Sequence, residues 1–183
     1  MRPALIALPI LLLMLGSASG CPSEPKPEPE PRSLAKPDAW VRVSDETQDL
    51  FAAERPADAT CDDAGYYFEP ITQALEVQTE LCNYVTLRQP TLEPLEPGDQ
   101  IRVQGYHGDL TAPEPSEGYL GLAIAGELAW ELSVPIPSAA AEFDQTFTCD
   151  RSLPAGVELQ LHVHNHGANS WDLIALEVTP TSG

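Results

Sequence analysis

Apolar and polar side chains alternate without a break in Val157-Glu158-Leu159-Gln160-Leu161-His162-Val163-His164. Successive side chains of an extended strand point to opposite faces, so a period of two separates an apolar face from a polar one. This pattern is typical of an antiparallel sheet with one buried face and one face in water. Residues 157–164 are therefore predicted to form a half-buried strand.

The same alternation recurs on both sides of this run. It predicts strands at 75–80, 100–106, 127–134 and 143–148, with shorter candidates at 40–44, 84–88, 119–125 and 171–178. One or two helical turns are expected near 47–53. Pro135 and Pro137 indicate that the strand before them lies at a sheet edge. A series of short strands without intervening helices predicts an all-β fold, an antiparallel β-sandwich.

The first 21 residues are mostly apolar or small, unlike the alternating segments that follow. Arg2 is followed by an apolar run from Ala4 to Leu15 and then by small residues up to Cys21. A short basic start, an apolar stretch too short to span a bilayer and a small-residue exit are typical of a secretory signal. Residues 1–20 are therefore predicted to be a signal peptide.

The small residues ending at Cys21 resemble a bacterial lipobox. That resemblance implies lipidation of Cys21 and a membrane anchor. Because Pro22 rather than Asp follows the cysteine, it also implies an outer-membrane location in the cell envelope. Ala18 stands where the class usually has Leu, so cleavage after Ser19 or Gly20, giving a secreted or periplasmic protein, is the alternative.

Six prolines fall among the sixteen residues 22–37, interleaved with charged side chains. Such spacing forbids a helix and favours an extended polyproline segment, with a reach of ~50 Å. Residues 21–37 are accordingly expected to be a lipidated cysteine and a Pro/Glu-rich linker. The β-sandwich domain is then expected to span 38–183, a length suited to one domain.

The chain is strongly acidic, with a formal net charge of −19, and residues 38–183 contain 25 acidic residues, five arginines and no lysine. This field repels phosphate backbones and anionic lipid headgroups, so nucleic acid is excluded as a partner. Solubility is the simplest purpose of such a charge.

Three cysteines lie in the predicted domain, at 61, 82 and 149. In an oxidising compartment a disulfide is expected, and Cys61 and Cys82 are the nearest pair in sequence. Closing that loop contributes ~3 kcal/mol in the chain-entropy account. Cys149 is then left as a buried small hydrophobe or an intermolecular thiol.

Two segments resemble the galactose-binding-like jelly rolls that include many carbohydrate-binding modules. They are the turn Leu95-Glu96-Pro97-Gly98-Asp99 before a strand, and the final Asn169-Ser170-Trp171-Asp172-Leu173-Ile174. The resemblance implies a jelly-roll-like sandwich that is non-catalytic. It also implies that aromatic and polar side chains on a concave sheet or on edge loops hold sugar rings.

Three of the four histidines fall in one short segment, at 162, 164 and 166. His162 and His164 share a face of their strand, ~6.5 to 7 Å apart, and can grip a zinc or copper ion. His166 or a carboxylate would supply the third ligand. The alternative is a polar strand face that carries histidines and binds no cofactor.

Residues 165–170 are expected to form a hairpin turn between the last two strands, because Asn and Gly tolerate positive φ. The functional alternative is a shallow polar site at this turn, formed by Asn165, His166, Asn169 and Trp171. Tyr84 and Tyr106 fall on polar phases of their strands and are the further platform candidates, whereas Trp130 and His107 fall on core phases.

No nucleophile elbow, phosphate loop, dinucleotide fingerprint or zinc-protease helix is present in the sequence. The leading hypothesis is a non-catalytic cell-envelope lipoprotein with a binding or adhesion module. Polysaccharide is the favoured partner, and a cell-surface glycan or protein is also permitted. The alternatives are a periplasmic or surface metal-binding protein that uses His162, His164 and His166, and a structural envelope protein.

Overall fold

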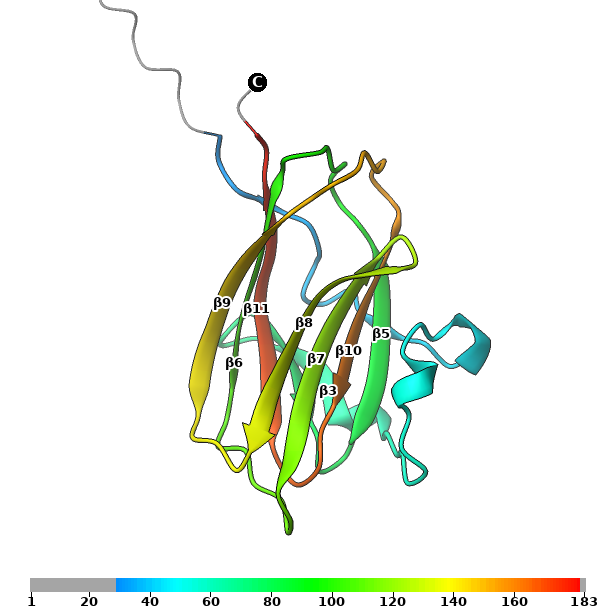
Figure 1. Cartoon of the computed structure of the whole chain (residues 1–183), viewed down its shortest axis with the longest axis vertical. Helices are drawn as coiled ribbons and strands as arrows, with labels where there is room; N and C mark the ends of the chain where they lie inside the picture. The colour runs from blue at the N-terminus through cyan, green and yellow to red at the C-terminus, as the bar shows by residue number, and fades with distance from the viewer. Residues whose placement is uncertain (1–28, 182–183) are drawn as a thin grey trace, which may run out of the picture.

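The computed structural model describes residues 29–181, which form two antiparallel sheets packed face to face (Figure 1). Sheet A has the strand order β3 (Tyr66–Glu69), β4 (Ala74–Gln78), β11 (Ser170–Thr179), β6 (Gln100–His107) and β9 (Ala141–Thr148), with β1 (Arg32–Ser33) on the far part of β11. Sheet B has the order β2 (Val41–Arg42), β5 (Tyr84–Pro90), β10 (Glu158–His164), β7 (Ser116–Ile124) and β8 (Glu127–Ile136). The predicted antiparallel β-sandwich is confirmed.

In the described part of the chain, helical structure is limited to single 3-10 turns at Glu46–Gln48, Ala52–Glu54 and Asp63–Gly65. The first two coincide with the helical turns expected near 47–53. Asp45 begins the first turn, since its side-chain oxygen accepts a hydrogen bond from the Thr47 amide at 2.9 Å. Within residues 29–181 no helix is long and apolar enough to cross a membrane.

The alternating run at 157–164 forms β10, the central strand of sheet B, paired with β5 on one side and β7 on the other. Leu159, Leu161 and Val163 point into the core and are almost fully buried, as predicted. The opposite face does not lie in water as expected, because residues 45–55 cross over it. We call residues 45–55 the strap.

The connection from β10 to β11 passes from sheet B to sheet A, so the expected hairpin turn at 165–170 is wrong. Each strand finds its partners in its own sheet: β11 pairs with β4 and β6. The connection packs tightly against the β6–β7 loop. A side chain at Gly167 would meet the Thr111 carbonyl, and the residue adopts a φ of +95°.

The folded domain begins earlier than the sequence indicated. Arg32 and Ser33 pair with β11, and Leu34 is fully buried in the core. The boundary expected at Asp38 is therefore too late, because residues 32–37 complete the sandwich. The signal peptide, Cys21 and the linker up to residue 28 lie outside the described residues.

The core fills the space between the sheets and includes Trp130, Trp171 and Phe143. Cys61 and Cys82 form the expected disulfide, while Cys149 is buried and takes part in no disulfide within residues 29–181. His107 is buried, and its Nδ1 lies 2.9 Å from the Gly108 carbonyl, as its core phase predicted.

Strand β8 is an edge of sheet B and β9 is an edge of sheet A, and both lie on the same side of the sandwich. Trp130 of β8 crosses between them, donating from Nε1 to the Gln145 side chain of β9 at 2.9 Å. The edge position predicted from Pro135 and Pro137 is thereby confirmed. The described chain enters and leaves at the same end of the sandwich, where β1 pairs with the end of β11 (Figure 1).

Candidate functional site

The polar face of β10 is buried beneath the strap. Gln160 receives a hydrogen bond from the Leu50 amide at 3.1 Å and donates to the Gln48 carbonyl at 2.7 Å. The Phe51 ring stacks on the His162 imidazole with centroids 4.6 Å apart. His162 is 0% exposed, so the sheet face that the sequence placed in water is part of a second packed layer.

A chain of hydrogen bonds runs beneath the strap from Asp49 to His164. Thr86 donates its hydroxyl to Asp49 Oδ1 at 2.7 Å and lies 2.8 Å from His162 Nδ1. Because a hydroxyl carries one hydrogen, His162 must donate from Nδ1, which leaves its Nε2 to accept from His164 Nδ1 at 3.1 Å. Burial, followed by the neighbouring His164, lowers the pKa of His162 to about 3, which agrees with a neutral ring.

The metal site expected at His162, His164 and His166 does not form. The first two imidazoles bond to each other, and His166 lies on the exposed turn after β10. Within residues 29–181 no group of three or more His, Cys, Asp or Glu side chains is placed to hold a metal ion. The two-residue spacing did bring His162 and His164 to one face, but their ring nitrogens lie 3.1 Å apart and contact each other directly.

The turn residues proposed as a sugar site have mostly structural roles. Trp171 is 2% exposed and packs against His107 and Phe143, so its ring is not available for stacking on a ligand. Asn165 is buried, and its amide donates to Thr79 Oγ1 at 3.0 Å. These assignments are corrected: Trp171 falls in phase with Leu173 and points inward.

Tyr84, which the sequence proposed as part of a sugar-binding platform, is only 3% exposed because it lies beneath the strap. Its hydroxyl lies 2.7 Å from Asp49 Oδ2 and 2.8 Å from the Phe51 carbonyl. Burial, together with the Asp49 carboxylate, raises the pKa of Tyr84. The sequence correctly placed Tyr84 on the polar face of its strand, but the strap covers that face.

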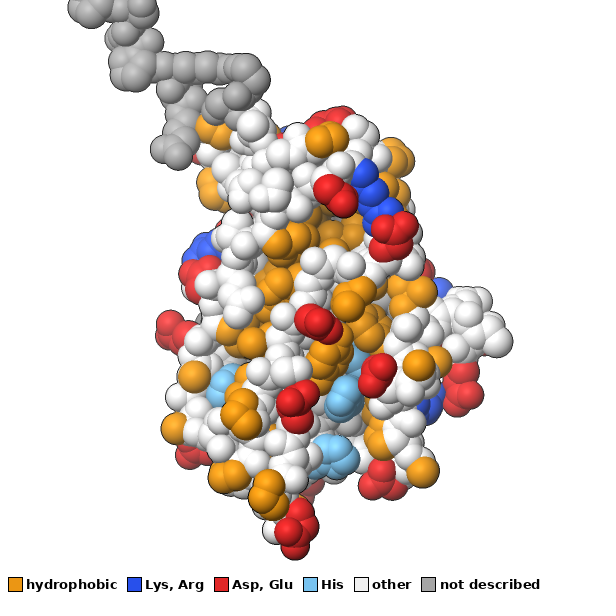
Figure 2. Space-filling model, in the orientation of Figure 1, with side chains coloured by type: hydrophobic (Ala, Val, Ile, Leu, Met, Phe, Trp, Pro, Cys, Tyr) orange, Lys and Arg blue, Asp and Glu red, His pale blue; other side chains and the backbone are white. Residues whose placement is uncertain are grey.

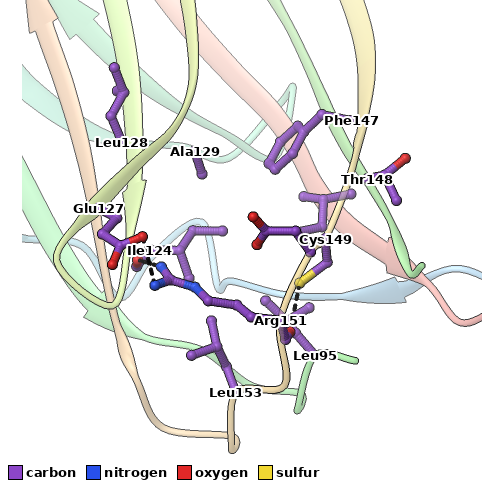
Figure 3. A pocket seen from close by; sticks show the side chains of 12 residues that line it. Leu95, Ile124, Glu127, Leu128, Ala129, Phe147, Thr148, Cys149, Arg151 and Leu153 are labelled. Atoms are coloured by element: carbon purple, nitrogen blue, oxygen red, sulfur yellow. Dashed lines mark hydrogen bonds and ion pairs between the residues drawn. The ribbon is translucent and has the colours of Figure 1, made fainter. Parts of the chain in front are cut away.

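A cleft opens between the free edges β8 and β9 (Figure 3). It has a volume of about 150 Å³, and Arg151 lies across it, paired to Glu127 at 2.7 Å and bonded to the Ile124 carbonyl at 2.9 Å. Apolar side chains gather on the face of the molecule that contains this opening (Figure 2). The cleft is smaller than the ≈ 300–1,000 Å³ usual for a ligand pocket.

The outer face of sheet A offers a better candidate. Tyr67 of β3 lies directly opposite Glu76 of β4, Glu76 lies opposite Asp172 of β11, and Asp172 lies opposite Tyr106 of β6. Glu76, Asp172 and Tyr106 point away from the core because their strand neighbours Leu75, Val77, Trp171 and His107 are buried, and Tyr67 lies on the same face because it is paired directly with Glu76. We call these four residues the tyrosine row.

Both tyrosines of the row have accessible rings, since Tyr67 is 37% and Tyr106 36% exposed. Gln78 fixes the Tyr67 end by donating to the Tyr67 hydroxyl at 2.9 Å and to Glu76 Oε1 at 3.0 Å. Two aromatic rings with hydrogen-bonding groups between them give apolar faces and polar contacts together.

Asp172, at the centre of the row, forms no hydrogen bond or ion pair with any other side chain of the described chain. Burial, followed by the charges of Glu76 and Glu69, raises the pKa of Asp172 to about 6. A half-buried carboxylate with no protein partner and a raised pKa is typical of a functional position.

A groove of about 360 Å³ adjoins the row on the outer face, at the end of the sandwich away from the termini. Its lining residues are Glu76, Gln78, Glu80, Gly108, Asp109, Ala168, Asn169 and Ser170. Asn169 thus lies at the candidate site, although its side chain is used to hold the β6–β7 loop through Thr111. A second depression of about 400 Å³ lies near Arg88, whose guanidinium is already bonded to Gln48 and Glu158.

Of the residues proposed from the sequence, Tyr106, Asn169 and exposed His166 lie on or near this end of the molecule. Tyr67 was only one of several aromatics able to build a platform, and Glu76, Gln78 and Asp172 were not assigned to a site. The alternation of 75–80 did indicate that Glu76 and Gln78 face outward together. Their pairing with Asp172 and the two tyrosines required the strand order of sheet A, which alternation does not specify.

No protein-family model matches the sequence, and no curated protein matches it. Solved structures with a similar fold include the C-terminal CBM6 of LamC, a marine laminarinase from Zobellia galactanivorans, at 16% identity and a TM-score of 0.41, over 63% of this chain and 89% of that one. A CBM61 solved with β-1,4-galactotriose is 11% identical with a TM-score of 0.42, over 82% and 99% of the two chains. A CBM4 is 14% identical with a TM-score of 0.42, over 83% and 95%. These three structures are carbohydrate-binding modules, and other similar structures include a bacteriophage tailspike domain and the catalytic domain of Agl-KA.

Proposed function

We propose that this protein is a non-catalytic carbohydrate-binding module that is anchored in the cell envelope through a lipid on Cys21. Polysaccharide is its partner, and the tyrosine row with the adjoining groove is its binding surface. The anchor rests on the signal sequence that ends at Cys21 and on the Pro-rich segment that follows it.

The observation that carries the binding proposal is the tyrosine row itself. A sugar ring has an apolar face and a rim of hydroxyls, so its binding site needs a flat aromatic surface next to hydrogen-bonding groups. Tyr67 and Tyr106 supply the rings, and Glu76, Gln78 and Asp172 supply acceptors and a donor between them. The adjoining groove falls within the usual volume range for a ligand site.

The test is retention of the whole mature protein on a panel of immobilised polysaccharides. We expect the native protein to be retained by at least one of them. The double variant Tyr67→Ala, Tyr106→Ala should bind that polysaccharide at least about tenfold more weakly, because both stacking surfaces are removed. Both side chains are over a third exposed, so the variant should keep its fold.

Leu128→Ala is the matched control, because Leu128 is 55% exposed on β8 and far from the row. It should bind like the native protein. Tyr67→Phe should also retain binding, because it keeps the ring. Equal retention of the native protein and the double variant, or retention by no polysaccharide, would refute the proposal.

A further inference from the structure

The tyrosine row runs across the strands, and this direction sets how a ligand lies on the sheet. Three strand spacings of ~4.8 Å separate Tyr67 from Tyr106, so their backbones lie ~14 Å apart along a line perpendicular to β11. Glu142 of β9 continues the line beyond Tyr106. A ligand that contacts both rings must therefore be an extended chain of several sugar units.

The outer face of sheet A carries an excess of acidic side chains around the tyrosine row. Around the row lie Glu69 and Glu76 on β3 and β4, Glu142 on β9, and Glu80 and Asp109 in the groove. The basic residues on the strands of sheet A are already paired: Arg102 binds Asp144 at 2.6 Å and Glu177 at 3.3 Å, and Arg32 binds Glu93 at 2.6 Å. No described cation of sheet A is left to neutralise Asp172 or Glu76.

We infer that the tyrosine row binds a linear polysaccharide that carries free amines, with Glu76 and Asp172 receiving an ammonium group between the two stacked tyrosines. This inference rests on the proposed function and names the class of its ligand. The tyrosines define the site and the carboxylates select its ligand. Uronate-containing and sulfated chains are repelled by the same carboxylates.

Three properties of the row favour an amine. Among residues 29–181 no side chain pairs with Asp172, so an ammonium group would supply a partner. Glu76 is held in place by Gln78, so the acceptor is oriented before the ligand arrives. Tyrosine rings attract a cation over their faces as well as stacking on a sugar.

The test compares two hexasaccharides of the same backbone, β-1,4-linked glucosamine and β-1,4-linked N-acetylglucosamine, by calorimetry on the mature protein. At about pH 7 Asp172 is ionised and part of the glucosamine amines is charged, and we expect the amine form to bind at least about tenfold more tightly. This preference should shrink below about pH 6, because Asp172 then takes up a proton.

Two variants separate the inference from the proposed function. Asp172→Asn, Glu76→Gln removes both charges at nearly constant shape, so it should abolish the preference for the amine form while still binding the acetylated one. Tyr67→Ala, Tyr106→Ala should weaken both. Equal affinity of the native protein for the two hexasaccharides would overturn the inference and leave carbohydrate binding standing. Absence of binding to any polysaccharide would overturn both.

Discussion

The burial of His162 beneath the strap makes the folding stability of the protein depend on pH. Its imidazole is fully buried between Phe51 and the sheet, and burial lowers its pKa to about 3. In the unfolded chain the same ring has a pKa near 6.5. Below about pH 6.5 the unfolded state therefore binds more protons than the folded state, and folding stability falls as the pH falls.

We expect this residue to cost on the order of 2 kcal/mol of stability between pH 7 and pH 4.5. Urea unfolding of the native protein and of His162→Gln at a series of pH values checks it. The variant should be less stable at pH 7 but should lose less stability on acidification. Asp172 contributes with the opposite sign below about pH 6, equally in both proteins, so the difference between the profiles reports His162. Parallel profiles would contradict the prediction.

The strap, residues 45–55, is the element that the sequence analysis did not foresee. Its residues show no period of two, and its role depends on contacts with β5 and β10, which are far away in sequence. The alternation of 157–164 correctly assigned Leu159, Leu161 and Val163 to the core. It could not show that Gln160 and His162 would be covered from the other side, because a polar face is equally compatible with water and with a hydrogen-bonded layer.

Other elements were predictable to different degrees. The main strands followed from alternation, and the Cys61–Cys82 disulfide from their proximity in sequence. The turn at 165–170 was misread because alternation identifies strands without showing which sheet they join. Trp171 was assigned to the site together with the polar residue Asn169 of the same turn. It shares a strand phase with Leu173, however, and therefore points into the core. β1 has only two residues, too few to show a period.

Phe51 anchors the strap and is 6% exposed, whereas the preceding Leu50 is 47% exposed. Phe51→Ala should lower the free energy of unfolding by about 3 kcal/mol, because it removes a buried ring and its stacking on His162. Leu50→Ala, a matched control on the same element, should change it by less than about 0.5 kcal/mol. Chemical denaturation measures both. Similar small effects from both variants would show that the strap contributes little to stability.

At the scale of the whole molecule, the proposed binding surface and the end at which the described chain begins lie at opposite ends of the sandwich. The described chain enters beside the end of β11, whereas the groove is formed near its start, at Asn169 and Ser170 (Figure 1). A module attached through its N-terminal side thus presents the tyrosine row away from the attached end. The acidic surface keeps such a module clear of anionic headgroups.

We expect radiolabelled palmitate to be incorporated into the native protein in a bacterial host and the protein to sediment with membranes. Cys21→Ser should lose the label and appear in the soluble or secreted fraction. Its affinity for the polysaccharide identified above should be unchanged, since Cys21 is not among the residues of the proposed binding surface. Unlabelled native protein in the soluble fraction would refute the lipid anchor without affecting the binding proposal.

The pairing of β1 with β11 determines how the domain responds to mechanical force. β1 runs antiparallel to β11, and the Leu34 amide adds a further hydrogen bond to the Leu176 carbonyl at 2.8 Å. When a pull on the N-terminal side is balanced by a load at the opposite end of the sandwich, the force acts along β1, so these bonds are sheared together and are not opened one after another. Leu34 is fully buried in the core, so sliding β1 along β11 also requires this side chain to leave its packing. Under the proposed anchoring, a ligand bound at the far end therefore loads the domain without peeling its first strand from the sheet.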